Sequence, residues 1–185
     1  MSSVNKAVFL DRDDTLMKNV PYCRDPDLVE PLPGVRDGLL RLQQAGFLLF
    51  IISNQSGIAR GLCTDREVQA VNARLEKLLH PAIFTGIYYS PDAPGTPSTT
   101  RKPAPGLILA AARKHNIHLP SSWMLGDQPS DIAAGRAAGC RTIWIPRHTA
   151  DQSDIRADHR ADDFTHAVEI ILRESTASNA MPNHT

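Results

Sequence analysis

The sequence predicts an α/β fold: a doubly wound, mostly parallel sheet with helices on both faces. Short apolar runs suited to buried strands alternate along the chain with segments of helical periodicity. Polar side chains stand where several of these runs stop. The predicted strands cover residues 7–10, 47–52, 83–89, 123–125 and 142–145. Right-handed crossovers would bring their carboxyl ends to one edge of the sheet, where such folds bind ligands.

Helical patterns separate and follow the predicted strands. The first begins after Gly34 and keeps its apolar spacing until Gly46 stops it. The second begins with a capping box, in which Thr64 is followed three residues later by Glu67. The remaining helices are predicted over residues 105–115, 130–138 and 164–175.

Length and composition favour one core. The chain has 185 residues, 42% of them hydrophobic, with 20 basic and 20 acidic side chains. We expect a single domain over residues 1–175 and a disordered tail over residues 176–185, where periodicity ends. No apolar stripe remains beyond the helices that cover the sheet, which predicts a monomer.

Charge and targeting signals indicate a cytoplasmic protein that binds small ligands. No charge run or basic stripe is present, so neither nucleic acid nor membrane is expected as a partner. The apolar run before the first acidic motif is too short for a signal sequence or a membrane span. Cys23, Cys63 and Cys140 lie far apart and outside any CxxC pairing, which predicts reduced thiols.

An acidic cluster, DRDDT, follows the first predicted strand and includes Asp11, Asp13 and Asp14. Carboxylates this close repel one another unless a cation or a proton lies among them. A hard divalent ion such as Mg²⁺ prefers oxygen ligands and would remove the conflict. An acidic turn that caps the next segment is the alternative, but the position at the end of a buried strand favours a metal site.

Other polar residues stand at three further strand ends. Ser53 falls where the second run stops and could bind a phosphate oxygen, although serine is also an ordinary turn former. Asp127 ends the fourth run, and Asp131 follows at a helix start, where a negative charge is favourable in any case. Lys102 lies in the proline-rich stretch 90–106 that follows the third run. The ordered set is more specific than any one member.

These motifs, DRDDT, SNQ, RKP and GDQPSD, resemble in order the four motifs of the haloacid dehalogenase-like (HAD) phosphatases of subclass IIIA. The resemblance covers about residues 6–146. The segments FLDRD, SNQSGIARG, GIYYSP and RKPAPG are most similar to the D-glycero-D-manno-heptose 1,7-bisphosphate 7-phosphatases, with the histidinol-phosphate phosphatases as close relatives. Both groups belong to a branch with almost no cap domain.

The resemblance implies roles for the matching residues. Asp11 would be the nucleophile that forms an aspartyl-phosphate, and Asp13 the general acid and base. Ser53 and Lys102 would neutralise the phosphoryl oxygens. The implied cofactor is Mg²⁺, held by Asp11, the backbone carbonyl of Asp13, Asp127 and, directly or through water, Asp131.

Four positions are candidates for substrate binding. Asn54 and Arg101 match residues that contact substrate in the heptose phosphatases, and Gln55 and Arg60 lie on the neighbouring loop. A bidentate arginine suits a second phosphate or sugar hydroxyls, which favours Arg101. Arg60 is explained as well by a solvated loop charge.

The chain departs from the family pattern in three places. Asp14 stands where a glycine is usual, and Gln128 where a lysine is common. The ligands of a structural Zn²⁺ in close relatives are replaced, so no zinc is expected. The replacing residues are Ser90, Asp92, Ser98 and Thr100. We expect the prolines of the stretch 90–106 to stiffen this loop in place of the metal.

The sequence therefore predicts a Mg²⁺-dependent phosphatase that acts on a small phosphorylated molecule, with heptose bisphosphate as the first candidate. Histidinol phosphate or a broad range of esters remains open, because loops rather than motifs set specificity. An inactive module that binds a phosphorylated ligand is the alternative from another class. The altered zinc loop and Asp14 favour it, whereas the joint presence of nucleophile, acid, lysine and second acid opposes it.

Overall fold

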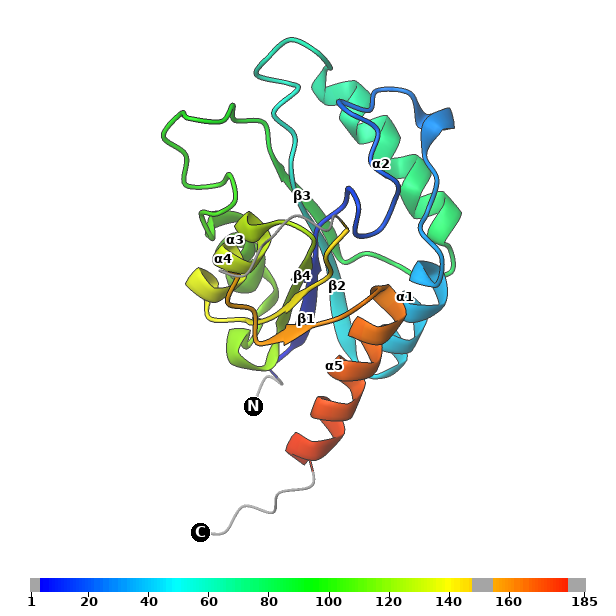
Figure 1. Ribbon diagram of the computed structural model, residues 1–185, viewed down its shortest axis with the longest axis vertical. Helices are drawn as coiled ribbons and strands as arrows, with labels where there is room; N and C mark the ends of the chain where they lie inside the picture. The colour runs from blue at the N-terminus through cyan, green and yellow to red at the C-terminus, as the bar shows by residue number, and fades with distance from the viewer. Residues whose placement is uncertain (1–3, 148–154, 180–185) are drawn as a thin grey trace.

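A computed structural model describes residues 4–147 and 155–179 of the chain (Figure 1). The described residues form a 6-stranded sheet of order β3-β2-β1-β4-β5-β6, in which every neighbouring pair is parallel. The strands are β1 (Lys6–Leu10), β2 (Phe47–Asn54), β3 (Gly86–Ser90), β4 (Trp123–Gly126), β5 (Arg141–Trp144) and β6 (His159–Arg160). The predicted doubly wound α/β fold is confirmed.

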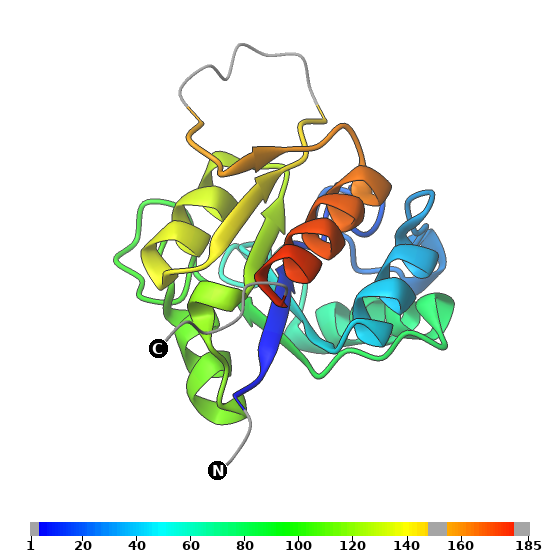
Figure 2. The same cartoon turned by 90° about the horizontal axis from the view of Figure 1, so that it is seen from below.

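Helices cover both faces of the sheet (Figure 2). The first face packs against α1 (Val35–Gln44), α2 (Asp65–Leu79) and α5 (Phe164–Asn179). The other packs against α3 (Gly106–His115) and α4 (Pro129–Ala138). Strand β2 shows the division, because Leu49 and Ile51 join the first apolar cluster while Phe50 and Ile52 join the second. Two short 3₁₀ helices, η1 (Pro26–Leu28) and η2 (Leu119–Ser121), complete the elements.

The predicted capping box of α2 is present with both of its hydrogen bonds. The backbone N–H of Glu67 donates to the Thr64 hydroxyl at 3.2 Å, and the Thr64 N–H donates to the Glu67 carboxylate at 2.7 Å. The Thr64 N–H and the Thr64 hydroxyl both donate to the Glu67 carboxylate, and these two bonds lower the pKa of Glu67. The start of this helix is therefore encoded locally, as the sequence predicts.

Strand β3 begins at Gly86, later than the apolar run 83–89 predicts. Ile83 is 65% exposed and stays out of the sheet. Its backbone N–H and carbonyl instead bond the side-chain amide of Gln43, at 2.9 and 3.0 Å. A side chain far away in the sequence thus satisfies backbone groups that a strand would have paired.

The C-terminal part of the chain contains two features that the sequence pattern did not predict. The polar segment before α5 contributes β6, an edge strand of 2 residues beside β5. Helix α5 continues to Asn179, beyond the residue where a tail was predicted to begin. The rest of that tail, 180–185, lies outside the described residues.

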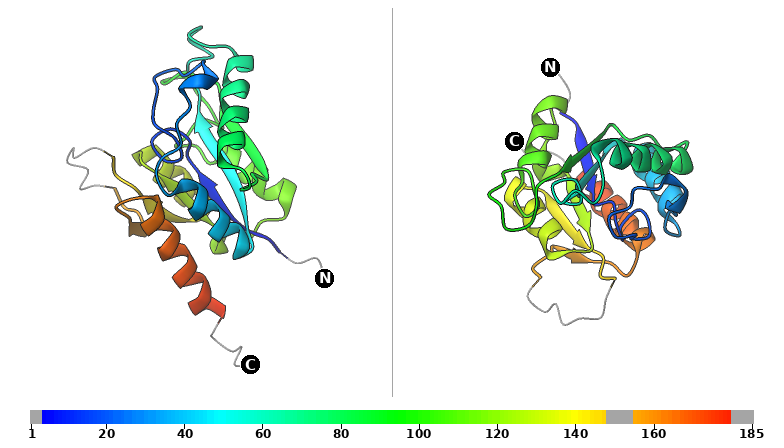
Figure 3. Two further views of the ribbon diagram at one scale, coloured as in Figure 1. Left: turned by 90° about the vertical axis from the view of Figure 1, so that its right-hand side faces the viewer. Right: turned by 90° about the horizontal axis from the view of Figure 1, so that it is seen from above.

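The strand order places the carboxyl ends of β1 and β4 side by side. The chain runs outward from β1 through β2 to β3, then returns to β4 on the other side of β1. Leu10 pairs with Leu125, so Asp11 and Gly126 follow at the same level of the sheet. Such a reversal opens a crevice between the two strands. The loops that follow β1, β2 and β3 gather at this end, away from the start of β1 and the end of α5 (Figure 3).

None of the helices in the described part of the chain is both long and apolar enough to cross a membrane.

Candidate active site

A cavity of about 440 Å³ lies at the carboxyl edge of the sheet, between the loops that follow β1 to β4. Most of the predicted site residues line it. They are Asp11, Asp13, Asn54, Gln55, Arg101, Lys102, Asp127 and Asp131. Residues far apart in the sequence therefore meet where the strand ends meet, as the sequence predicts.

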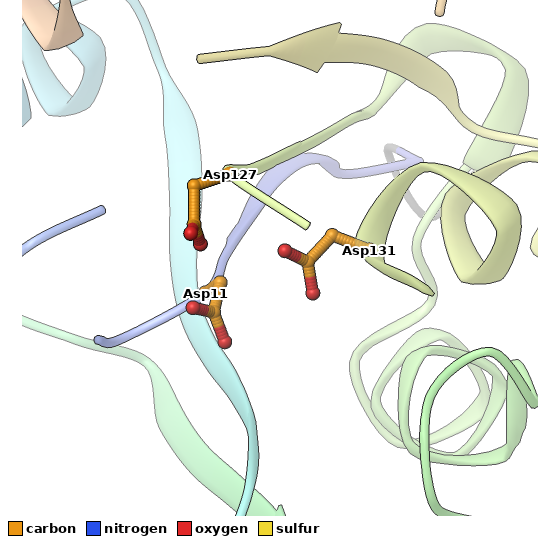
Figure 4. Close-up of side chains that lie close together, drawn as sticks. All are labelled: Asp11, Asp127 and Asp131. Carbon is orange, nitrogen blue, oxygen red and sulfur yellow. The ribbon is translucent and has the colours of Figure 1, made fainter. Parts of the chain in front are cut away.

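Three buried carboxylates face one another in this cavity (Figure 4). Asp11 follows β1, Asp127 follows β4, and Asp131 projects from the first turn of α4; each offers an oxygen within 4.8 Å of the others. Burial raises the pKa of Asp11 well above its ordinary value; Lys102 opposes this shift, whereas Asp131 and Asp13 add to it. Burial likewise raises the pKa of Asp127 to about 6. Both shifts mean that ionised carboxylates are penalised here, chiefly by burial and further by the neighbouring carboxylates.

Close packing holds Asp131 against the tip of β4. A Cβ atom at Gly126 would lie 2.2 Å from Asp131 Oδ2, so any larger residue would displace this carboxylate. The same Oδ2 accepts the backbone N–H of Gln128 at 3.0 Å and so caps α4. Asp131 therefore lies at the helix start, where the sequence predicts a favourable charge, and also belongs to the acidic cluster.

Lys102 lies at the centre of the acidic cluster. Its Nζ is 2.5 Å from Asp11 Oδ1, 2.6 Å from Asp131 Oδ1 and 2.7 Å from the carbonyl oxygen of Ile52. Burial alone would lower the pKa of Lys102, but the charges of Asp11 and Asp131 raise it above its ordinary value. The lysine therefore stays protonated and provides a fixed positive charge.

The donor set fits a hard divalent cation. Three carboxylates face one ammonium group, which leaves two negative charges uncompensated when all are ionised. Oδ1 of Asp127 is buried and has no hydrogen-bond partner among the described residues, whereas its Oδ2 accepts from Gln128 Nε2 at 2.5 Å. Both oxygens of Asp131 are already bonded. Asp11 and Asp127 are therefore the better direct ligands, and oxygen donors of this kind suit Mg²⁺.

Asp13 is held by an arginine that the sequence interpretation did not use. Arg12 is 1% exposed, and its Nε and Nη2 both donate to the Asp13 carboxylate, at 3.0 Å in the shortest contact. Its Nη1 donates to Asn72 Oδ1 at 2.9 Å, and its Nη2 also reaches Gln55 Oε1 at 3.1 Å. Asn72 interrupts the apolar stripe of α2, and this polar residue at a core position was the available signal.

Ser53 lies behind the cavity wall, whereas Gln55 lines the cavity. Ser53 is buried and is not among the residues that line the cavity. Its hydroxyl accepts from Gln55 Nε2 at 3.3 Å, and the same amide nitrogen donates to Asp13 Oδ2 at 3.2 Å. Gln55 therefore stands between Ser53 and the cavity.

Asn54 binds the backbone of the lysine. Its Oδ1 accepts the Lys102 N–H at 2.9 Å, and its Nδ2 donates to the Lys102 carbonyl at 3.1 Å. This pair of hydrogen bonds joins the end of β2 to the loop after β3, so the Asn54 side chain holds the Lys102 backbone in place.

The two candidate arginines occupy different places. Arg101 lines the cavity, and its Nη1 donates to the carbonyl of Asp92 at 3.1 Å. Arg60 is not among the lining residues; it lies over the ring of Tyr22, 5.4 Å from the centroid, and bonds the Tyr22 hydroxyl. Tyr22 does line the cavity. Arg60 therefore contacts a residue of the cavity wall but does not line the cavity itself.

Asp14 adopts the left-handed conformation, with a φ of +58°. Glycine tolerates this backbone best, and aspartate better than most other residues. The Asp14 carbonyl accepts from Arg147 Nε at 2.7 Å. The substitution for glycine is thus compatible with the loop geometry.

Comparisons with known proteins agree with this geometry. Residues 99–169 match the HAD-hydrolase-like family model. A D-glycero-D-manno-heptose-1,7-bisphosphate 7-phosphatase from Thermosynechococcus vestitus is 35% identical, over 89% of this chain and 94% of that protein. A D-glycero-beta-D-manno-heptose-1,7-bisphosphate 7-phosphatase from Helicobacter pylori is 37% identical, over 91% of this chain and 99% of its own length. The crystal structure of the D,D-heptose 1,7-bisphosphate phosphatase from B. bronchiseptica, complexed with magnesium and phosphate, superposes with a TM-score of 0.84 at 28% identity, over 91% of this chain and 99% of that one.

Proposed function

The chain belongs to the family of D-glycero-D-manno-heptose-1,7-bisphosphate 7-phosphatases, which are HAD-type phosphatases, and from that premise we propose the substrate and the residue roles. The substrate is D-glycero-D-manno-heptose 1,7-bisphosphate, cleaved with Mg²⁺ at the cavity on the carboxyl edge of the sheet. One observation carries the proposal above all: buried Asp11 contacts protonated Lys102, beside an Asp127 oxygen that has no hydrogen-bond partner in the part of the chain that the structure describes.

In the first step a carboxylate oxygen of Asp11 attacks phosphorus, and the bond from phosphorus to the sugar oxygen breaks. Asp13 gives its proton to the departing oxygen. Its side chain is 26% exposed and lines the cavity, so the leaving group has access to it. The products of this step are the free sugar hydroxyl and an aspartyl-phosphate on Asp11.

In the second step a water molecule attacks the phosphorus of the aspartyl-phosphate. Asp13, now a carboxylate, takes the proton of this water, and the bond from phosphorus to Asp11 breaks. Inorganic phosphate leaves and both carboxyl groups return to their starting states. Arg12 and Gln55 hold Asp13 at the cavity wall between these two proton transfers.

Lys102 supplies the fixed positive charge for the phosphoryl group. Its contacts with Asp11 and Asp131 are made before substrate arrives, so little reorganisation is needed as charge spreads over the phosphoryl oxygens. Asn54 fixes the lysine backbone. Mg²⁺, when bound by Asp11, Asp127 and the Asp13 carbonyl, would screen the phosphoryl charge from the attacking carboxylate. Asp131 would act through Lys102 and, at most, through a metal-bound water.

Specificity for the heptose is the finer part of the proposal. It is supported by the names of the relatives and by Arg101, whose guanidinium lines the cavity and suits an anionic or hydroxylated group. Histidinol phosphate and a broad range of esters are the competing substrates. An inactive module is disfavoured, because membership in a phosphatase family comes together with the nucleophile, the acid and the lysine on one cavity.

A substrate survey tests the function. We expect hydrolysis of heptose 1,7-bisphosphate to exceed that of histidinol phosphate, other sugar phosphates and p-nitrophenyl phosphate, and to stop when Mg²⁺ is chelated. Phosphate release is the measurement. Equal rates on the heptose ester and the generic esters would reject the substrate assignment.

A monomer is also proposed. The large hydrophobic side chains that the described residues expose are few and come from separate segments. They are Val4, Tyr22, Leu28, Leu62 and Ile83. Light scattering that gave the mass of a dimer would overturn this.

A further inference from the structure

A compact hydrogen-bonded cluster closes the base of the loop between β3 and α3. Three hydroxyl groups surround one carboxylate oxygen, Asp92 Oδ2: Ser98 Oγ at 2.5 Å, and Ser90 Oγ and Thr100 Oγ1 each at 3.1 Å. The hydroxyls also contact one another, with Thr100 Oγ1 3.1 Å from Ser90 Oγ and 3.3 Å from Ser98 Oγ. We call these four residues the Asp92 clasp.

The clasp joins the outgoing and returning limbs of the loop. Ser90 is the last residue of β3 and is buried, and Asp92 follows it, whereas Ser98 and Thr100 belong to the returning limb. Ser90 is buried, and Ser98 and Thr100 are half-buried. A hydroxyl removed from water in this way needs a hydrogen-bond partner, and each of the three contacts Asp92 Oδ2. The hydrogen bonds from Ser98, Ser90 and Thr100 lower the pKa of Asp92, so the carboxylate is ionised at neutral pH.

The returning limb is also packed tightly against the start of α3. The backbone N–H of Gly106 donates to the carbonyl of Thr99 at 3.1 Å. A Cβ atom at Gly106 would lie 2.1 Å from that carbonyl oxygen, so only glycine allows this approach. The clasp is thus anchored to β3 on one side and to α3 on the other.

The clasp continues directly into Arg101. Ser98 Oγ accepts the backbone N–H of Arg101 at 2.8 Å and that of Thr100 at 3.1 Å. At the other end of the residue, Arg101 Nη1 donates to the Asp92 carbonyl at 3.1 Å. Both the backbone and the guanidinium of Arg101 are therefore held by clasp residues. Lys102, the next residue, is held by Asn54, Asp11 and Asp131 instead.

We propose that Asp92 and Ser98 are positioning residues for substrate recognition: their metal-free clasp fixes Arg101 toward the part of the substrate that is distant from the reacting phosphate. That part would be anionic or rich in hydroxyls, because a guanidinium recognises such groups. The inference rests on the proposed function for its substrate. The side-chain groups of the clasp are all oxygen donors and acceptors, and its hydrogen bonds already use Asp92 Oδ2.

The first experiment separates recognition from chemistry. We expect Asp92→Ala to raise KM for heptose 1,7-bisphosphate by about tenfold, the scale of a lost charge-assisted contact, with kcat changed by less than about twofold. Hydrolysis of p-nitrophenyl phosphate, which lacks the distant part, should stay within about twofold of wild type. Thr96→Ala is the matched control: it removes an exposed loop hydrogen bond, to the Ala93 carbonyl, without touching the clasp. An equal loss of kcat on both substrates would reject a positioning role.

A double-mutant cycle shows whether the clasp acts through Arg101. If it does, Asp92→Ala should have no further effect on KM once Arg101→Ala is present, so the two changes are strongly non-additive. Ser98→Ala should reproduce the rise in KM. Ser98→Thr keeps the hydroxyl, so its KM should stay close to the wild-type value. Additive effects of Asp92→Ala and Arg101→Ala would overturn the inference.

Backbone amide hydrogen exchange tests the clasp without any substrate. Asp92→Ala should speed exchange at the amides of Thr100 and Arg101, and Thr96→Ala should not. If the wild type shows no preference for the heptose ester, the proposed substrate fails, yet this exchange result still decides whether the clasp exists. Unchanged exchange in Asp92→Ala, or stoichiometric zinc in the purified protein with exchange that speeds up on chelation, would reject the metal-free clasp.

Discussion

Arg101 and Lys102 are neighbours in the chain, but different parts of the molecule hold them. Lys102 is buried and bonded to residues from the end of β1, the end of β2 and the first turn of α4. Arg101 is half-buried, and its hydrogen bonds go to Asp92 and Ser98 of its own loop. The group proposed for chemistry is thus held by several secondary-structure elements, whereas the group proposed for recognition is held by its own loop.

This division has a physical consequence for substitutions. Changes on the Lys102 side disturb several elements and a buried charge balance, so they should affect every substrate. Changes on the Arg101 side should affect only substrates that reach that far. Variants of residues on each side of this division should therefore differ in which substrates they affect and by how much.

Asp11→Asn should lower kcat by about 10⁴-fold or more on every phosphate ester, because the amide cannot form the aspartyl-phosphate. Phosphate release with heptose bisphosphate and with p-nitrophenyl phosphate is the measurement. Asp37→Asn, an exposed substitution of the same kind on α1, is the control and should be silent. Retention of full activity in Asp11→Asn would show that Asp11 is not the nucleophile.

Asp127→Asn should lower activity by about 10²- to 10³-fold and abolish the thermal stabilisation that Mg²⁺ gives the wild type. Without metal the same variant should be more stable than wild type at pH 7, by about 1–3 kcal/mol, because burial opposes an ionised carboxylate there. Thermal unfolding with and without Mg²⁺ measures both effects.

The pH dependence of the metal-free protein provides a sharper check on Asp127. Its folded pKa, about 6, lies above its ordinary value, so the folded state binds the proton more tightly than the unfolded chain does. The contribution of this group to stability should therefore fall as pH rises from about 4 to about 6 and then level off. Asp127→Asn should remove that part of the slope. An unchanged slope would mean that burial does not penalise this carboxylate.

Asn54→Ala should lower kcat by roughly 10- to 100-fold on both heptose bisphosphate and p-nitrophenyl phosphate, because the Lys102 backbone loses both of its side-chain hydrogen bonds. Gln69→Ala removes an exposed amide on α2 and is the matched control. Should Asn54→Ala raise KM for the heptose ester alone, Asn54 would belong to the recognition side, as the sequence predicted.

Arg60→Ala should change kcat/KM by no more than about threefold on either substrate, because the side chain lies outside the cavity against Tyr22. Arg66→Ala, an exposed arginine at the start of α2, provides the comparison. A loss of tenfold or more that is specific to the heptose ester would place Arg60 in substrate recognition.

The sheet and the position of the site could be predicted because both follow from periodic patterns. Apolar runs give the strands, and polar residues at the ends of parallel strands must meet at one edge. Asp11, Lys102, Asp127 and Asp131 were identified in this way, and the structure brings them together.

The contacts that position these residues could not be predicted. The partners of Arg12 lie on α2 and after β2, and the amide of Asn54 reaches a backbone 48 residues away. The Asp92 clasp depends on how an aperiodic loop folds back on itself. Hydrogen bonds of this kind leave no repeat in the sequence, and only the folded geometry reveals them.

The two outer strands of the sheet have a consequence for association between molecules. Strand β3 has 5 residues and β6 only 2, and Gln43 bonds the backbone of Ile83 that would otherwise lengthen β3. A sheet edge recruits strands from other chains through its unpaired N–H and C=O groups. Because β6 is this short and the backbone of Ile83 is already bonded, the two edges offer neighbouring molecules little template for strand pairing, which should limit aggregation through the sheet edges.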